Sequence, residues 1–258
     1  MLGPLVKWPG GKSRLAKRVV RILPDHDTYV EPFAGGASIF WNKPKSKTEV
    51  LNDASKWLMD FYRSVQRGEL ASCKPTVRSR ENFARLGRCS SACCKLMLNK
   101  MSFHGDNKAI EHIAKIGELV GERTVRDIPV YEKRLKNAKL MHGDFEKAMR
   151  QHDGPRTLHY LDPPYTEDAK AKEYSKRHYE HGELSFKRVV DVARTMQGKV
   201  MISFDANPNS IKVAQKAGFK VYRIMGTTNV LGNGSQPKVE IVACNFEIPK
   251  SKLKPSNR

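Results

Sequence analysis

The sequence predicts an α/β fold built on a seven-stranded, mostly parallel sheet that ends in an antiparallel hairpin. Three observations lead to this prediction. Seven short segments rich in Val, Ile, Leu, Phe and Tyr recur along the 258 residues, and helical patterns lie between most of them. The last two segments are joined by a stretch that has no helical period.

Each predicted strand is a short apolar run of β-branched and aromatic residues. The seven strands are expected at residues 28–33, 49–53, 139–144, 157–162, 199–205, 220–226 and 239–246. Between them, apolar residues recur three or four apart in residues 12–23, 56–67 and 184–196, which predicts amphipathic crossover helices. Residues 227–238 are rich in Gly and Asn, so the last two strands are expected to pair antiparallel.

The spacing between the second and third strands predicts an insertion. About eighty residues separate Asp53 from Lys139, far more than a crossover helix and its loops require. The inserted region is basic and has mainly helical patterns. We expect a catalytic domain of residues 1–55 and 138–249, an inserted helical recognition domain of residues 56–137, and a disordered basic tail of residues 250–258.

The charge balance predicts a polyanionic partner. Lys and Arg total 47 against 27 Asp and Glu, which gives a formal net charge of +20. Nucleic acid fits this charge, because neutralising phosphates releases counterions and supplies affinity independent of sequence. A basic but merely solvated surface is the alternative. No apolar run approaches the length of about 20 residues that spans a bilayer, and the first residues lack a secretory signal, so a cytoplasmic protein is expected.

The five cysteines are expected to be reduced thiols. They are an odd number in a chain too long to need disulfide staples: Cys73, Cys89, Cys93, Cys94 and Cys244. The alternative is a zinc site, but the paired spacing of structural zinc motifs is absent.

Acidic residues fall at the carboxyl ends of several predicted strands. Asp53, Asp144, Asp162 and Asp205 each end a strand, and Glu31 lies near the end of the first. Ligands bind at this edge of an open α/β sheet. One such acid can simply cap the next helix, but five together favour a ligand that carries hydroxyl groups or positive charge.

Residues 31–38, between the first strand and the next helix, contain Gly35 and Gly36, which let the backbone pass close to a ligand. The pattern is not the Gly-x-Gly-x-x-Gly fingerprint, which disfavours a nicotinamide or flavin cofactor. Asp53 follows Gly36 by seventeen residues, where a Rossmann-like site places the acid that accepts hydrogen bonds from ribose. Together these features indicate an adenosine-containing cofactor.

The N-terminal segment, residues 7–13, ends in Gly-Lys-Ser but is not a phosphate-binding loop. The first glycine of such a loop would have to stand at Val6, and no strand precedes it. Trp8 and Lys12 could instead form the wall of a small-molecule pocket, the ring by stacking and the ammonium by pairing with a carboxylate. A core tryptophan beside a surface lysine is the alternative.

The strongest motif is Asp162-Pro163-Pro164-Tyr165, which directly follows a predicted strand. Two successive prolines stop the strand and form a rigid corner. Such a corner can hold the Asp162 carboxylate and the Pro163 carbonyl as acceptors for both hydrogens of an amino group on a nucleobase, while Tyr165 stacks on a base turned out of a duplex. A plain turn with a surface tyrosine is the alternative.

With these motifs, the chain resembles the Dam-type, or D12 class, DNA adenine-N6 methyltransferases over most of its length. The resemblance implies a Rossmann-like S-adenosylmethionine-dependent methyltransferase fold and S-adenosyl-L-methionine as cofactor. It implies catalytic roles for Asp162, Pro163, Pro164 and Tyr165. The residues it places at the cofactor are Trp8, Lys12, Glu31, Phe33, Gly35, Gly36, Asp53, Asp144, Phe145 and Asp162.

The family places its recognition region where the insertion falls here, and residues 98–105 resemble its DNA-reading loop. By this resemblance Asn99, Lys100, Ser102, Phe103 and His104 would contact double-stranded DNA. The segment departs from the commoner Asn-Arg…Phe-Asn pattern, so the target sequence is left open. The host would be a bacterial cell, which could equally express the protein from a phage genome.

The expected reaction is direct in-line methyl transfer to N6 of a flipped adenine, without a covalent enzyme intermediate and without a metal. Three alternatives stay open at this point. A cytosine-N4 methyltransferase faces the same electronic problem, although Asp before the two prolines favours adenine by resemblance. A methyltransferase for protein glutamine or RNA would usually begin the tetrapeptide with Asn. A DNA-binding relative could have kept the fold and lost catalysis.

Overall fold

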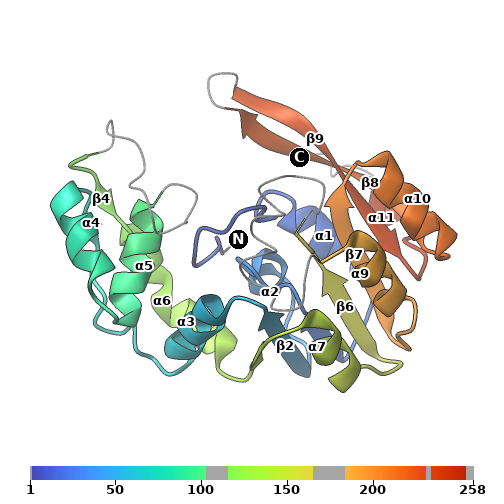
Figure 1. Cartoon of the computed structure of the whole chain (residues 1–258), viewed down its shortest axis with the longest axis horizontal. Coiled ribbons are helices and arrows are strands. Elements are labelled where there is room, and N and C mark those ends of the chain that lie inside the picture. Colours follow the sequence, from blue (N-terminus) through green and yellow to red (C-terminus); the bar gives the residue numbers. More distant parts are fainter. Residues whose placement is uncertain (1, 103–115, 165–183, 231–233, 254–258) are drawn as a thin grey trace.

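The expected α/β fold with a seven-stranded sheet is confirmed. The computed structural model describes residues 2–102, 116–164, 184–230 and 234–253, and side chains outside 225–238. The sheet order is β5-β2-β1-β6-β7-β9-β8, with the first five strands parallel (Figure 1). The strands are β1 (Thr28–Glu31), β2 (Thr48–Asp53), β5 (Lys139–His142), β6 (Thr157–Leu161), β7 (Lys199–Asp205), β8 (Lys220–Val230) and β9 (Gly234–Cys244).

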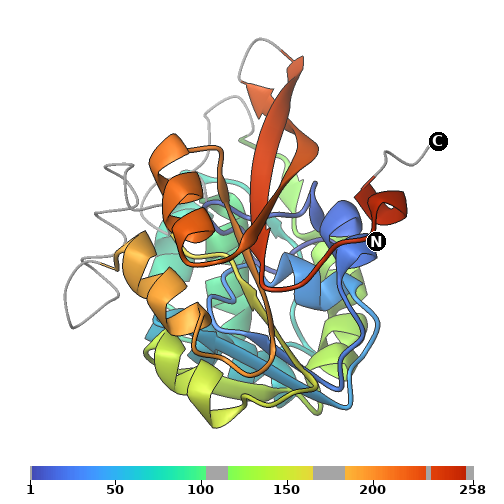
Figure 2. The ribbon, with the colours of Figure 1, turned by 90° about the vertical axis from the view of Figure 1, so that its right-hand side faces the viewer.

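Helices cover both faces of this sheet, and each face has its own apolar cluster (Figure 2). One cluster joins the sheet to α7 (Phe145–Gln151), α9 (Phe186–Ala193) and α10 (Pro208–Lys216). The other joins it to α1 (Ala16–Ile22), α2 (Ser38–Asn42), α3 (Lys56–Gln66) and α6 (Glu122–Leu135). Apolar strand residues on both faces are the pattern of a sheet buried between two helical layers.

The expected antiparallel hairpin is confirmed, but it is longer than the sequence predicted. β8 and β9 pair from Lys220↔Cys244 to Val230↔Gly234, so residues expected in the connection lie in the strands. β7 pairs with β9 only as far as Asp205↔Glu240. The outer half of the hairpin therefore extends beyond the carboxyl end of β7 and projects from the sheet in Figure 1.

The insertion is mainly helical, as expected, but it also contains a small sheet. Its helices include α4 (Arg80–Gly87) and α5 (Ala92–Met101), which pack on each other and lie to one side of the main sheet in Figure 1. β3 (Thr76–Val77) and β4 (Leu119–Val120) pair antiparallel. Serine caps explain where several helices begin: the hydroxyls of Ser55, Ser79 and Ser91 accept backbone N–H groups of α3, α4 and α5.

The division into two domains stays a prediction, and the two ends of the insertion pack closely on the sheet. α3 contacts β2 and β5. Arg134 near the end of α6 donates to the Phe40 carbonyl at 2.9 Å and pairs with Glu49 of β2. Tyr131 donates to the Gly3 carbonyl at 2.8 Å. The first and last helices of the insertion therefore share the apolar core of the catalytic sheet.

The prediction of reduced thiols is wrong for four of the five cysteines. Disulfides join Cys73 to Cys93 and Cys89 to Cys94, and Cys244 is a buried free thiol. The fold of the insertion brings the segment after α3 to the start of α5, with Cα atoms of Cys73 and Cys93 5.2 Å apart. Chain length carries no information on this proximity.

Within the described ranges no cluster of three or more His, Cys, Asp or Glu side chains could hold a metal ion.

The predicted disordered tail is wrong for its first four residues. Lys250–Leu253 form the short helix α11, and Leu253 packs against the core while Lys252 donates to the Leu23 carbonyl at 3.4 Å. These contacts order the segment. Residues 254–258 lie outside the described part of the chain. None of the described helices is long and apolar enough to cross a membrane.

Candidate active site

Acidic side chains lie on five consecutive strands at one edge of the sheet. Asp53 ends β2, Glu31 ends β1, Asp162 directly follows β6, and Asp205 ends β7. Glu240 lies opposite Asp205 on β9. The strand order reverses between β1 and β6, so Glu31 and Asp162 flank the point where open α/β sheets bind ligands. The expected clustering of acids at this edge is therefore present, with Glu240 as an addition that the sequence did not suggest.

Lys12 lies between two of these carboxylates. Its Nζ is 2.9 Å from Asp162 Oδ1 and 3.1 Å from Glu240 Oε1, and it also donates to the Gly10 carbonyl at 3.3 Å. The lysine side chain is 5% exposed and that of Glu240 is 1% exposed. Residues 13–15 form turns, so the first helix begins at Ala16 and not at residue 12 as predicted.

The protonation of this cluster follows from burial and from the neighbouring charges. Burial raises the pKa of Asp162 to about 6; Lys12 opposes this rise, while Glu240 and Asp205 add to it. Burial alone would lower the pKa of Lys12, but Asp162 and Glu240 together raise it above its ordinary value. Lys12 is therefore an ammonium at neutral pH, and Asp162 is a carboxylate of raised basicity.

Glu31 is a fully buried acid beside this cluster. The Tyr29 hydroxyl donates to Glu31 Oε2 at 2.8 Å. Burial raises the pKa of Glu31 to about 8; the Tyr29 hydrogen bond opposes the rise and the negative charge of Asp162 adds to it. Glu31 therefore holds a proton near neutral pH, although the positive charge of Lys43 opposes the rise.

Asp53 organises the glycine loop. Its Oδ2 accepts the Gly35 N–H and its Oδ1 accepts the Ser55 N–H, both at 2.9 Å. Burial raises the pKa of Asp53 to about 6 against the lowering effect of these two hydrogen bonds. The Asp53 carboxylate thus attaches the glycine loop to the end of β2 through these two hydrogen bonds.

Gly35 cannot be replaced without moving Trp8. Its φ is +45°, in the left-handed region, and a Cβ at this position would lie 2.7 Å from Trp8 Cδ1. Trp8 in turn stacks on Trp57 with 6.4 Å between ring centroids. The Tyr62 hydroxyl fixes the same loop by donating to the Gly35 carbonyl at 2.6 Å. The loop and the N-terminal segment, both predicted as cofactor motifs, therefore pack directly on each other.

Asn52 is a structural residue of this edge that was not among the predicted site residues. Its side-chain amide donates to the Pro32 carbonyl at 3.0 Å and to the Gly143 carbonyl at 2.9 Å. One buried amide thus joins the ends of β1 and β5 across β2. A polar residue inside an apolar strand, directly before Asp53, was the available signal.

Asp144 and Phe145 form a different arrangement from the other strand-end residues. β5 ends at His142, and Asp144 caps α7 by accepting the Glu146 N–H at 2.9 Å. Arg188 of α9, which was not predicted, pairs with both oxygens of Asp144 at 3.0 and 3.1 Å. Phe145 is fully buried and stacks on Phe33 at 5.0 Å between centroids. Asp144 is therefore a helix cap in this structure, which was the alternative given for acids at strand ends. Contact of Asp144 and Phe145 with a cofactor stays a prediction.

Two of the residues predicted to contact DNA are buried. Asn99 is 0% exposed, and its amide both accepts the Lys7 N–H at 2.7 Å and donates to the Lys7 carbonyl at 3.2 Å. Ser102 is also fully buried and donates to the Leu98 carbonyl at 2.5 Å. In this conformation they attach the N-terminal segment to α5. Lys100 donates to the Pro4 carbonyl at 3.4 Å, and burial, with Lys7 nearby, lowers its pKa to about 8.

Three predicted site residues lie outside the described part of the chain: Tyr165, Phe103 and His104. Of the catalytic tetrapeptide, Asp162 and Pro164 are partly exposed and Pro163 is buried. The three described residues of the motif therefore present a carboxylate at the sheet edge on a corner made by two prolines.

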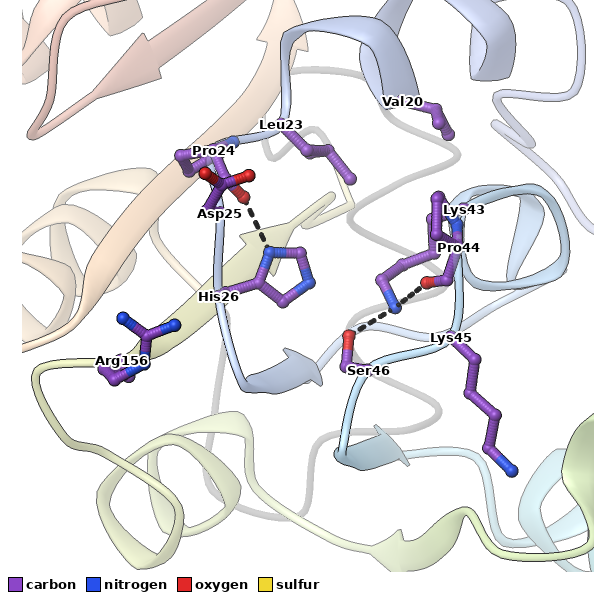
Figure 3. Close-up of a pocket in the computed structure, with 10 residues that line it drawn as sticks. All are labelled: Val20, Leu23, Pro24, Asp25, His26, Lys43, Pro44, Lys45, Ser46 and Arg156. Atoms are coloured by element: carbon purple, nitrogen blue, oxygen red, sulfur yellow. Dashed lines mark hydrogen bonds between the residues drawn. The ribbon is translucent and has the colours of Figure 1, made fainter.

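A surface pocket lies at the opposite edge of the sheet. Figure 3 shows its lining, which comes from the segments before β1, β2 and β6 and includes His26, Lys43, Ser46 and Arg156. Its polar groups bond to one another: Lys43 donates to Ser46 Oγ at 2.7 Å and His26 Nδ1 lies 2.7 Å from the Pro24 carbonyl. None of the five acids at the carboxyl ends of the strands lines this pocket. The candidate active site is therefore the carboxyl edge, where those acids lie, and not this pocket.

The family to which the chain is similar is the D12 class N6 adenine-specific DNA methyltransferases. The family model matches residues 8–85 and 123–228, which contain the glycine loop, Asp53, Asp144 and the Asp-Pro-Pro-Tyr tetrapeptide. The chain belongs to this family. This D12 enzyme is therefore an adenine-specific DNA methyltransferase, as the resemblance implied, and the cytosine-N4 alternative gains no support.

Curated relatives agree with this assignment. The D12 enzyme is 26% identical to the type II methyltransferase M1.LlaDCHI of Lactococcus lactis subsp. cremoris, over 95% of this chain and 96% of that protein. It is 25% identical to the DNA N-6-adenine-methyltransferase of Escherichia phage P1, over 89% of this chain but 33% of that protein. The DNA adenine methylase of Haemophilus influenzae is 23% identical over 78% of this chain and 77% of its own length.

Among solved structures, the D12 enzyme is similar to precorrin-6y C5,15-methyltransferase of Geobacter metallireducens GS-15. The TM-score is 0.43 with 8% identity, over 94% of this chain and 98% of that chain. The family model leaves residues 86–122 unmatched. That segment contains α5 and the expected DNA-reading loop. The missing match agrees with the departure of this loop from the commoner Asn-Arg…Phe-Asn pattern.

Proposed function

We propose that the carboxyl edge binds S-adenosyl-L-methionine and that this D12 enzyme methylates N6 of an adenine turned out of double-stranded DNA. The single observation that carries the proposal is the ion pair between buried Lys12 and partly exposed Asp162, which joins the N-terminal motif to the catalytic tetrapeptide. The two motifs are 150 residues apart in the chain. Their contact supports the proposal that the N-terminal motif belongs to the active site.

The residues of the edge fit such a cofactor. The left-handed Gly35 leaves room for Trp8 to pack on the glycine loop, and acids at the ends of four strands together with Glu240 of β9 provide carboxylates. Negative charge attracts a sulfonium and an α-amino group, and carboxylate oxygens accept hydrogen bonds from ribose hydroxyls. We assign this role to Trp8, Lys12, Asp53 and Asp162.

The chemistry requires an amino group that is made more nucleophilic. When bound, S-adenosyl-L-methionine supplies an electrophilic methyl group. Asp162 and the Pro163 carbonyl would accept the two N–H groups of the adenine amine, which favours a pyramidal nitrogen and relieves the positive charge that develops on it. Asp162, with its pKa raised to about 6, can also take the proton that leaves the amine. Transfer is direct, so no covalent enzyme intermediate is needed.

The insertion would supply the contacts to the DNA backbone. Helix α4, its C-terminal cap and α6 carry exposed arginines, which can neutralise phosphates without reading sequence: Arg80, Arg85, Arg88, Arg123 and Arg126. The expected base contacts of Lys100, Phe103 and His104 remain part of the proposal. Asn99 and Ser102 would act by holding the N-terminal segment against α5.

Replacing Asp162 by Ala tests the catalytic assignment. Removing the Asp162 carboxylate should lower kcat by about 10³-fold or more, because loss of one hydrogen bond to the transition state has an effect of this size. Lys12 keeps Glu240 as a partner, so the fold should survive. The measurement is transfer of labelled methyl from S-adenosylmethionine to mixed-sequence duplex DNA, with mass spectrometry of the nucleosides.

The matched control is Asp191→Ala, which removes an exposed acid of α9 that pairs with Lys187. This variant should retain wild-type activity. Asp162→Ala with wild-type kcat, or a methylated nucleoside other than N6-methyladenine from the wild type, would contradict the proposal.

A further inference from the structure

Glu240 is a buried acid that neither the tetrapeptide nor the cofactor motifs include. It lies in β9 within the apolar run Val239–Cys244, where a charged side chain requires a partner. Two partners are present. The Ser203 hydroxyl donates to Glu240 Oε1 at 3.0 Å, and Lys12 Nζ lies 3.1 Å from the same oxygen.

The arrangement makes two carboxylates share one ammonium. Asp162 Oδ1 and Glu240 Oε1 lie at similar distances from Lys12 Nζ, 2.9 and 3.1 Å. An ammonium paired with Asp162 alone would neutralise that carboxylate and weaken it as a hydrogen-bond acceptor. Because Glu240 binds the same ammonium, part of this effect is cancelled and the Lys12 side chain is held in one place.

We propose that Glu240 is a positioning residue for methyl transfer: through Lys12 it fixes the place and the charge of the Asp162 carboxylate that accepts the target amine. The proposal rests on the proposed function. Ser203 supports the same role, because its hydroxyl fixes the oxygen of Glu240 that Lys12 contacts. Glu240 itself need not touch cofactor or DNA.

The charged and titratable groups around Asp162 come from every element packed against it. They are Lys12 of the N-terminal segment, Glu31 of β1, Tyr160 of β6, Asp205 of β7 and Glu240 of β9. Among the described side chains, Lys12 is the group that stabilises the charged form of Asp162. Removing the negative charge of Glu240 should therefore let Asp162 ionise at lower pH and make it a weaker base.

The test compares wild type with Glu240→Gln, which keeps the size of the side chain and removes its charge. Methylation of duplex DNA with labelled S-adenosylmethionine is followed from about pH 5 to 9. We expect kcat to fall about tenfold, KM for S-adenosylmethionine to change less than about twofold, and the acid limb of kcat to move down by about 0.5–1 pH unit. The control Glu247→Gln, an exposed acid just beyond β9, should match wild type.

Several outcomes would overturn the proposal. A Glu240→Gln variant with wild-type kcat, one with lower kcat but an unmoved acid limb, or one with raised KM alone would remove Glu240 from this role while leaving the proposed function intact. An inactive wild type would instead overturn the proposed function and this inference with it. If Glu240→Gln does not fold, Ser203→Ala decides: a kcat lowered about threefold supports the role, and a wild-type kcat overturns it.

Discussion

Asp53 and Asp162 end strands that flank β1, yet their carboxylates do different work. Asp53 accepts two backbone N–H groups and holds the glycine loop. Asp162 pairs with a buried ammonium at 2.9 Å. Asp53 therefore shapes the site. Asp162 lies at the proline corner and keeps a raised basicity, because burial outweighs the opposing effect of Lys12.

Gly35→Ala should both destabilise the protein and weaken cofactor binding. The left-handed φ and the 2.7 Å approach to Trp8 Cδ1 act together, so the free energy of unfolding should fall by about 3 kcal/mol. Displacing Trp8 should raise the Kd for S-adenosylmethionine at least about tenfold. Chemical denaturation and calorimetric titration measure the two effects.

Gly68→Ala is the matched control for this prediction. Gly68 also has a positive φ, +76°, but a Cβ there meets nothing within 4 Å. Its loss of stability should be smaller, about 1 kcal/mol, and cofactor binding should not change. Equal effects of the two substitutions on cofactor affinity would refute the role given to the Gly35–Trp8 contact.

Glu31 should make the protein less stable as pH rises through neutrality. Its pKa is about 8 in the folded state against an ordinary 4.5, so the folded state binds more protons than the unfolded state between these values. The free energy of unfolding should therefore fall with rising pH by up to about 1.4 kcal/mol per pH unit for this one group. In Glu31→Gln this contribution disappears.

Denaturant unfolding at several pH values between about 5 and 7.5 measures the difference in slope. Asp53 and Asp162 titrate in both proteins and cancel in the comparison. Glu247→Gln is the control, because Lys220 lowers the pKa of Glu247 below 4.5 and its titration falls under this window. Parallel curves for wild type and Glu31→Gln would count against a protonated Glu31.

Among the elements, α6 returns the chain from the insertion to the sheet through a buried ion pair. Arg134 pairs with Glu49 of β2, and Lys43 lies 2.6 Å from the same carboxylate. Arg134 also stacks on Phe40, with 3.9 Å from Cζ to the ring centroid. These groups connect the last helix of the insertion to the second strand, so the place of the inserted helices depends on a contact inside the main sheet.

Glu49→Gln should destabilise the protein strongly, because it leaves Arg134 and Lys43 buried without their shared anion. A loss of about 3 kcal/mol in the free energy of unfolding is expected from chemical denaturation. Asp27→Asn is the control, since Asp27 pairs with Arg156 and Lys47 at the surface and should contribute little. A smaller effect at Glu49 than at Asp27 would show that α6 is held by apolar packing alone.

At the scale of the whole molecule, charge is separated by position. The chain carries +20, yet the carboxyl edge of the sheet collects five acids, two of which pair with the buried Lys12. The positive excess therefore lies outside the edge, and arginines of α4 and α6 carry part of it. A polyanion is attracted to the exterior while the acidic edge favours a cationic cofactor.

DNA affinity should fall steeply as salt rises. If six to ten phosphates are contacted, the association constant should drop by about 10³-fold or more between about 50 and 200 mM salt. Fluorescence anisotropy of labelled duplex DNA measures this slope. Calorimetric titration of S-adenosylmethionine over the same range is the control and should change little, since that site is largely buried. A salt-independent Kd for DNA would argue against phosphate contacts.

Much of the fold was predictable because its signals are local. Apolar runs of strand length predicted all seven strands, and the gap after Asp53 predicted the insertion. β3 and β4 were missed because two-residue strands leave no periodic signal. The paired cysteines were missed because their proximity depends on how α4 and α5 pack.

The sequence by itself determined the sheet, the position of its acids at strand ends and the proline corner after Asp162, since each depends on neighbouring residues. Only the tertiary structure decided which charges meet. Lys12 reaches Asp162 because the N-terminal segment lies against the glycine loop. Glu240 reaches Lys12 because β9 pairs with β7 in the register Asp205↔Glu240. A slip of one residue would turn Glu240 to the other face of the sheet, and register is a property of two strands together.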